Sequence, residues 1–163
     1  MKEIFLTLDK IALVDDEDYE RVNQYKWQAQ PHHTGKMWYA KRTINLGNGS
    51  FTTMRMARFI LDVEAETLID HRDRDTLNNQ KYNLRLASSQ QNAANAGPRG
   101  ASSGYKGVHW NESAKKWQVS RKGRYIGVFS DVIEAARAFD AIAYKEDGEF
   151  AYLNFPLHEK AGE

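Results

Sequence analysis

Ile69-Asp70-His71, Tyr82-Asn83-Leu84-Arg85-Leu86 and Gln91-Asn92 form the stretch that decides the fold around the middle of this chain. Two short runs, 68–70 and 83–87, predict strands, and the polar loop 72–80 separates them. Ser88 or Ser89 can cap a helix over 90–96, and Gly97-Pro98 follows it as a stop signal. The sequence therefore predicts a strand–loop–strand–helix unit of about thirty residues, which needs neighbours to bury its apolar side chains.

The same stretch contains the residue types that metal-assisted phosphodiester cleavage requires. The imidazole of His71 can take a proton near neutral pH. A hard divalent cation prefers oxygen ligands, which Asp70 and Asn92 can supply. A bound metal stabilises the leaving oxygen of a phosphodiester. Each residue also has a plainer reading, because aspartate and asparagine are common in turns and on solvated helices. Their joint order and spacing favour the catalytic reading.

Composition excludes several classes of protein. The chain has 163 residues, no cysteine, 41% hydrophobic and 28% charged residues, which predicts a folded and soluble protein. The strand and helix signals along the chain predict the α+β class. Without cysteine, a disulfide framework and a cysteine-ligated structural zinc site are impossible. No signal peptide or transmembrane run is visible, so we expect an intracellular protein of the cytoplasm or nucleoid, with no membrane partner.

Charge is grouped along the chain, although its net value is only +1. Residues 36–61 hold five basic and no acidic residues, and residues 99–130 hold seven basic residues against one acidic residue. Residues 1–20 and 131–163 each carry a net −5. Solvated faces of this kind are common, but two basic blocks flanking the central motif favour a nucleic-acid partner.

The flanking segments predict two further units. Residues 1–62 are expected to be β-rich, with strands near 5–8, 11–14, 27–29 and 37–42 and helices over 15–25 and 53–61. Residues 99–104 form the clearest linker. In 105–157 we expect strands near 107–110, 116–121 and 125–129 and a helix from 130 or 131 to 145, where Asp131 and Glu134 can form a capping box. Residues 158–163 are a tail.

The central unit, 63–98, resembles the HNH endonucleases of phages and mobile elements, including homing enzymes. Asp70-His71, Asn78-Asn79, Asn83-Leu84-Arg85 and Gln91-Asn92 carry the resemblance, and His71, Asn83 and Asn92 have the family's spacing. The resemblance implies a ββα-metal (His-Me finger) unit. It makes His71 the general base, with Asn83 orienting it by a hydrogen bond, and Asp70 and Asn92 the ligands of one Mg²⁺ or Mn²⁺ per active site.

The third segment resembles the Apetala or ethylene-response-factor type of DNA-binding domain. The resemblance is carried by Tyr105-Lys106-Gly107-Val108, Lys116-Trp117-Gln118-Val119, Tyr125-Ile126-Gly127-Val128-Phe129, Glu134 to Asp140 and Leu153-Asn154-Phe155-Pro156. It implies a three-stranded antiparallel sheet that reads the DNA major groove and packs on one helix. The DNA contacts it implies are Lys106, His109, Trp110, Lys116, Gln118, Ser120, Arg121, Arg124 and Tyr125. Plant members carry several arginines on this face, where this chain has Lys, His and Ser, so their target sequence does not transfer.

The first segment resembles the leading region of phage HNH proteins through Leu8 to Tyr19 and Met54 to Leu61. Relatives often carry a His-Arg pair in the latter, where this chain has Ala57-Arg58. Backbone contacts to DNA are expected from Tyr39, Lys41, Arg42, Arg55 and Arg58, with purely structural use as the alternative.

We therefore expect a divalent-metal-dependent DNA endonuclease that nicks or cuts duplex DNA. We expect a monomer, with a dimer as the alternative. Three other readings stay open. The chain could be a DNA-binding regulator with an inactive HNH remnant, a nuclease directed to RNA or without sequence specificity, or an interaction module with neither activity.

Overall fold

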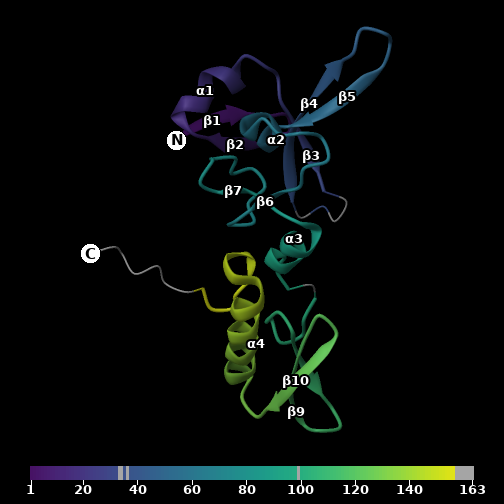
Figure 1. Cartoon of the computed structure of the whole chain (residues 1–163), viewed down its shortest axis with the longest axis vertical. Coiled ribbons are helices and arrows are strands. Elements are labelled where there is room, and N and C mark those ends of the chain that lie inside the picture. Colours follow the sequence, from purple (N-terminus) through teal and green to yellow (C-terminus); the bar gives the residue numbers. More distant parts are fainter. Residues whose placement is uncertain (33–34, 36, 99, 157–163) are drawn as a thin grey trace, which may run out of the picture. The chain divides into compact units, whose positions relative to one another are not determined.

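A computed structural model describes residues 1–32, 35, 37–98 and 100–156 of the chain. It has mixed α+β structure, with several small antiparallel sheets and few helices, as the sequence predicts. The chain divides into two compact units, Met1–Ser89 and Gln90–Glu163 (Figure 1). The expected tail, 158–163, lies outside the described residues.

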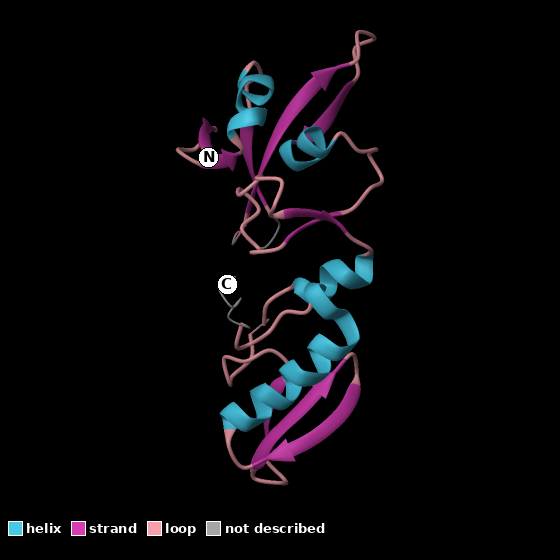
Figure 2. Cartoon of the chain, turned by 60° about the vertical axis from the view of Figure 1, so that its left-hand side comes forward, coloured by secondary structure: helices cyan, strands magenta, loops and turns pink. Residues whose placement is uncertain are grey.

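The first unit begins with a two-stranded sheet and continues with a three-stranded one. β1 (Lys2–Phe5) pairs antiparallel with β2 (Ile11–Val14), and α1 (Asp16–Asn23) follows. β3 (Gln28–Pro31), β4 (Trp38–Asn45) and β5 (Phe51–Arg55) form the second sheet, with β4 in the centre. The β4–β5 hairpin extends away from the rest of this unit (Figures 1 and 2).

The predicted helix over 53–61 is wrong in its first part. Residues up to Arg55 belong to β5, which pairs with β4 from Lys41↔Arg55 to Asn45↔Phe51. Helix α2 covers only Met56–Leu61. The β-branched Thr52 and Thr53 favour the strand, because they pack well on a pleated surface.

One hydrophobic core holds the first unit together. Its largest fully buried apolar side chains are Val14, Val22 and Met56, and Trp27 and Ile60 are buried beside them. The short hairpin of β6 (Ile69–His71) and β7 (Leu84–Leu86) joins the same core through Leu84, with Ile69 and Leu77 packed against it. The hairpin thus obtains from its neighbours the apolar contacts that it cannot supply alone.

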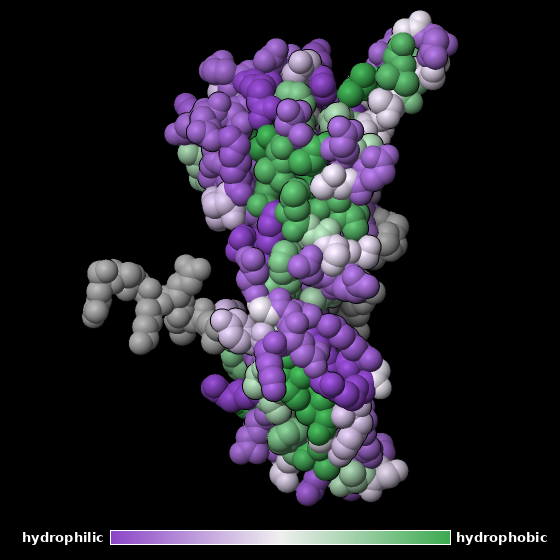
Figure 3. All heavy atoms as spheres, viewed as in Figure 1, coloured by the Kyte–Doolittle hydropathy of each residue, from purple (hydrophilic) through white to green (hydrophobic). Residues whose placement is uncertain are grey.

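The second unit begins with α3 (Ser89–Asn95), apart from the first residue of that helix. β8 (Val108–Asn111), β9 (Lys116–Arg121) and β10 (Arg124–Phe129) form an antiparallel sheet with β9 in the centre. Helix α4 (Val132–Asp147) packs on one face of this sheet, and a 3-10 turn, Gly148–Phe150, ends it. In Figure 3 the green hydrophobic residues of this unit gather around α4.

Sequence features account for the bounds of α4 and its packing. The Asp131 side chain accepts hydrogen bonds from the backbone N–H groups of Ile133 and Glu134, as an N-cap residue does. Ala135, Ala136, Phe139 and Ala143 face Val108 and Val119 of the sheet in the buried core. Gly107 has a positive φ of 76°, and a Cβ there would lie 2.2 Å from the Phe139 ring. Only glycine fits this close approach.

Among the described residues, no helix is both long and apolar enough to cross a membrane.

Candidate active site

The two strands β6 and β7 bring His71 and Asp70 to a fixed place in the first unit. They pair antiparallel with Asp70 opposite Arg85 and His71 opposite Leu84. Both His71 and Asp70 are buried, with 7% and 4% of their surface exposed. A short, paired strand of this kind fixes the direction of its side chains better than a loop does.

Asn83 closes the loop that follows His71. Its side-chain nitrogen donates to Asp73 Oδ1 at 2.9 Å and to the Asn78 carbonyl at 2.8 Å. Its side-chain oxygen accepts from the Asp73 backbone N–H at 3.0 Å. Asn83 is fully buried, so these bonds replace the water it loses on folding. Asn83 thus ties the two ends of segment 73–78 together.

Strand β2 holds the same loop from the other side. The Leu13 N–H donates to the Leu77 carbonyl at 2.9 Å, and the Asn79 N–H donates to the Leu13 carbonyl at 2.8 Å. The Asp15 carboxylate accepts from the Lys81 N–H at 2.7 Å and from the Gln80 side chain at 3.1 Å. The loop is therefore anchored to β2 and to the residue that follows it.

The hydrogen bond that was expected between His71 and Asn83 is made by Asn79 instead. His71 Nε2 lies 3.3 Å from Asn79 Oδ1. Asn79 is buried, with 2% exposure, and its side-chain nitrogen donates to the Leu77 carbonyl at 3.1 Å. Asn83 acts on the same loop through Asp73 and Asn78. The sequence marked Asn79 as part of the motif but gave no means of choosing between the two amides.

Burial is the main influence on the titration of His71. It lowers the pKa of the imidazole below its ordinary value of 6.5, while the hydrogen bond to Asn79 and the nearby carboxylates of Asp73 and Asp70 act in the opposite direction. A lowered pKa keeps the ring neutral near pH 7. A neutral imidazole is the form that can accept a proton.

Asp70 forms an ion pair that the sequence reading missed. Its Oδ2 accepts from Nε of Arg85 at 2.8 Å and from Nη2 at 2.7 Å. Both residues are buried, and they are direct cross-strand partners. Charge-assisted bonds of this kind hold a carboxylate in one orientation. The signal in the sequence is that Asp70 and Arg85 carry opposite charges on two predicted strands that one loop connects.

The last proposed ligand, Asn92, lies on α3 and is exposed. Carboxylate and carboxamide oxygens such as those of Asp70 and Asn92 form a donor set suited to a hard divalent cation. Among the residues that the structure describes, no group of three or more His, Asp or Glu side chains could hold a metal by itself. Asp70 belongs to the first unit and Asn92 to the second, so their joint binding of one metal stays a prediction.

The outer face of the β8–β9–β10 sheet presents several of the proposed DNA-contacting residues. Val108 pairs with Val119 and both are buried, so their neighbours in the strands face the other way. This alternation, with the pairing of Tyr125 to Ser120, defines the outer sheet face. Its proposed DNA contacts are His109, Lys116, Gln118, Ser120 and Tyr125.

Three proposed DNA contacts lie on the other side of that sheet. Arg121 lies two residues after Val119 and therefore on the same face of the sheet, toward α4. It is buried and forms ion pairs with Glu146 and Asp147. Arg124 remains exposed but pairs with Glu146. Trp110 packs edge-on against Trp117 at 5.1 Å between ring centres. For Arg121 the two-residue period of the strand argues against a DNA contact.

Three of the four basic residues of the first unit that were expected to contact DNA divide between the two faces of the β4–β5 hairpin. Lys41 and Arg55 are cross-strand partners on the β4–β5 hairpin, and Arg55 stacks on Tyr39 at 4.2 Å. Arg42 points to the opposite face, where its guanidinium lies 3.7 Å from the centre of the Tyr25 ring. Arg42 therefore packs within the unit, whereas Lys41 and Arg55 place two like charges side by side.

Comparison with known proteins finds one relative that matches nearly the whole chain. A protein of Acanthamoeba polyphaga mimivirus, described as an uncharacterised HNH endonuclease, is 32% identical over 159 residues, which cover 92% of this chain and 73% of that protein. No family model matches the chain, and neither does any solved structure. The extent of the similarity, over nearly the whole chain, is enough to establish kinship. This chain belongs to the HNH endonuclease family.

Proposed function

We propose that this protein is a divalent-metal-dependent endonuclease that hydrolyses phosphodiester bonds of duplex DNA. The observation that carries the proposal is the placement, on β6, of the buried His71 directly after the buried, ion-paired Asp70. Kinship with HNH endonucleases supports the reaction class.

In this proposal His71 is the general base that takes a proton from the attacking water. Burial favours the neutral ring, and Asn79 fixes its orientation through Nε2. Removal of a general base commonly costs a factor of about 10²–10⁴ in rate. Asn83 contributes by closing the loop that carries Asn79, rather than by touching the ring.

Asp70 and Asn92 would hold one Mg²⁺ or Mn²⁺, whose charge stabilises the leaving 3′ oxygen when it is bound. Arg85 holds the Asp70 carboxylate in one orientation. The products would carry 5′-phosphate and 3′-hydroxyl ends. Because one active site cleaves one strand, a monomer would nick the duplex. A double-strand break would require two cleavage events or a dimer.

We further propose that the second unit reads duplex DNA in the manner of an Apetala-type domain. Its support is the three-stranded sheet with one helix behind it, together with the mixture of Lys, His, Gln, Ser and Tyr on the outer sheet face. Lysines would contact phosphates, whereas Gln118 and Tyr125 are suited to base edges and sugars. Asp and Glu residues gather instead on α4 and after it.

The β4–β5 hairpin would add contacts to the DNA backbone. Lys41 and Arg55 face each other across the two strands, an arrangement in which like charges repel. A bound polyanion would relieve that repulsion. Leu46 and Phe51 are exposed near the end of the hairpin, where Figure 3 also shows green, hydrophobic atoms.

Incubation of the protein with supercoiled plasmid in Mg²⁺, with a parallel EDTA sample, tests the proposal. Conversion of supercoiled to open-circular DNA only in Mg²⁺ would support it. Tight, salt-sensitive DNA binding without cleavage, on a plasmid library of random targets as well, would favour a regulator with an inactive HNH remnant.

A further inference from the structure

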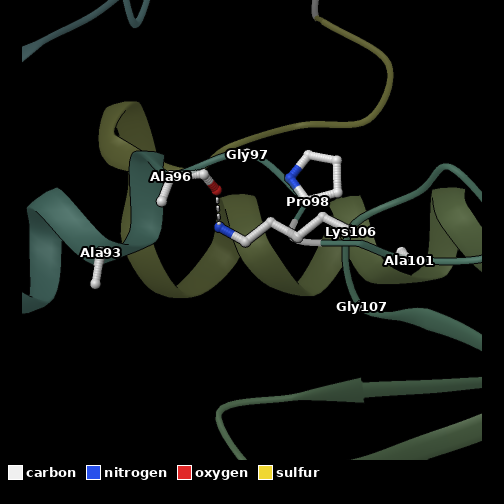
Figure 4. A pocket seen from close by; sticks show the side chains of 7 residues that line it. All are labelled: Ala93, Ala96, Gly97, Pro98, Ala101, Lys106 and Gly107. Atoms are coloured by element: carbon white, nitrogen blue, oxygen red, sulfur yellow. Dashed lines mark hydrogen bonds between the residues drawn. The ribbon is translucent and has the colours of Figure 1, made fainter. Parts of the chain in front are cut away.

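Lys106 stands where the Apetala resemblance expects a DNA contact, yet its side chain is engaged within the protein. Its Nζ donates to the backbone carbonyls of Ala94 and Ala96, each at 2.6 Å. Figure 4 shows this side chain extending along Gly97 and Pro98 toward the end of α3. The ammonium also lies 5.4 Å from the centre of the Tyr152 ring.

The two carbonyls belong to the end of α3. The last four carbonyls of a helix have no partner within it, and a cation near them is favourable. α3 has no basic residue in its own last turn. The Tyr152 N–H also donates to the Ala94 carbonyl, at 3.1 Å. Lys106 and Tyr152 together therefore satisfy the end of α3.

The backbone of Lys106 is fixed to α4 through two further residues. Its N–H donates to Asn154 Oδ1 at 2.7 Å, and its carbonyl accepts from Asn154 Nδ2 at 3.2 Å. The Asp140 carboxylate of α4 accepts from the Asn154 N–H and side chain, at 2.8 and 3.0 Å. A continuous chain of hydrogen bonds thus runs from α4 to the end of α3.

We propose that Lys106 is a positioning residue that fastens α3, the helix that carries Asn92, to the sheet-and-helix body of the second unit. It does so in place of a contact with DNA. This inference rests on the proposed function for the role of Asn92, but not for the fastening of α3. A lysine with both backbone and side chain committed in this way is poorly placed to bind a phosphate.

Hydrogen exchange on the full chain tests the fastening without any cleavage assay. In Lys106→Met, the amides of α3 should exchange about tenfold faster or more, because a charge-assisted cap is lost, while those of α4 stay protected. Lys106→Arg keeps the charge and the donors and should restore most of the protection. Lys145→Met removes an exposed lysine of α4 and serves as the control. Unchanged exchange of α3 in Lys106→Met would overturn the inference.

DNA binding and metal dependence then separate positioning from contact. Without divalent metal, Lys106→Met should keep the DNA affinity and the salt dependence of the wild type. A loss of about one unit in the salt slope would instead identify a phosphate contact and overturn the proposal. In nicking assays the Mg²⁺ concentration for half-maximal rate should rise about tenfold, with most of the rate recovered at high Mg²⁺. If the wild type does not nick, the proposed function fails while the exchange result still decides the fastening.

Discussion

Asn79 presents its side-chain oxygen to Nε2 of His71 at 3.3 Å, and the structure fixes which way round the amide lies. The amide nitrogen of Asn79 donates to the Leu77 carbonyl, so the oxygen must face the ring. In the tautomer that donates from Nε2 to this oxygen, Nδ1 carries the lone pair that can accept a proton. The orientation of the His71 ring is therefore set by a loop that β2 and Asn83 hold in place.

Replacing this amide should change both the rate and its pH dependence. Asn79→Ala should lower the nicking rate about tenfold or more, because an outer partner of a catalytic histidine is lost. Asn79→Asp should move the rate profile to higher pH, because a carboxylate favours the protonated ring. Nicking rates from pH 5 to 8 measure both effects, and Asn23→Ala, on the exposed end of α1, is the control. If the rate profile of Asn79→Asp does not move to higher pH, the result would argue against the contact between Asn79 and the His71 ring.

The pH dependence of the wild type follows from the buried ring. Burial lowers the pKa of His71, so the base form should predominate already below pH 6.5 and the nicking rate should level off there. An inflection at or above pH 6.5 in metal-saturated nicking would contradict this.

The free energy of unfolding should change with pH in the same range. Since the folded pKa lies below the unfolded one, this stabilising contribution is present above pH 6.5 and is lost as pH falls through the folded pKa.

The ion pair between Asp70 and Arg85 should matter for folding as well as for metal binding. Arg85→Met leaves a buried carboxylate without its guanidinium, which typically costs about 3–5 kcal/mol. Urea unfolding measures the loss. The double variant Asp70→Asn, Arg85→Met should recover part of the stability but no metal-dependent cleavage. Lys115→Met, which breaks the exposed pair with Glu112, should cost under about 1 kcal/mol. Equal losses of unfolding free energy in Arg85→Met and Lys115→Met would contradict the buried pair.

The outer sheet face predicts which basic residues respond to salt. Lys116→Met should weaken DNA binding and reduce the salt slope by about one, because an exposed lysine on that face is lost. Arg121→Met should instead destabilise the second unit, because Glu146 and Asp147 lose their buried partner. DNA binding at several salt concentrations, with thermal unfolding of each variant, separates the two. A reduced slope in a fully folded Arg121→Met would show that the arginine reaches DNA.

Local patterns in the sequence predicted most elements, and the misses have identifiable causes. The α4 cap at Asp131 and the strand 116–121 follow from short-range signals and were predicted correctly. The strand that ends at Arg55 was mistaken for a helix, because its identity depends on pairing with β4 across a turn. Periodicity within one segment carries no information about such a partner.

The candidate site shows the same limit at the level of side chains. Spacing selected His71, Asp70 and Asn83, but whether Asn79 or Asn83 touches the ring depends on how the loop docks on Leu13. Likewise the resemblance placed Arg121 among the DNA contacts, although its strand position turns it toward α4. Contacts between residues far apart in the chain decided both cases.

The most direct test of the central claim compares His71→Ala with the wild type on supercoiled plasmid in Mg²⁺, with DNA binding measured in parallel. His32→Ala removes another histidine of the first unit and serves as the control. We expect nicking to fall by about 10²–10⁴ in His71→Ala while DNA affinity is retained, and to persist in His32→Ala. Equal nicking by His71→Ala and the wild type would contradict the assignment of His71 as the base.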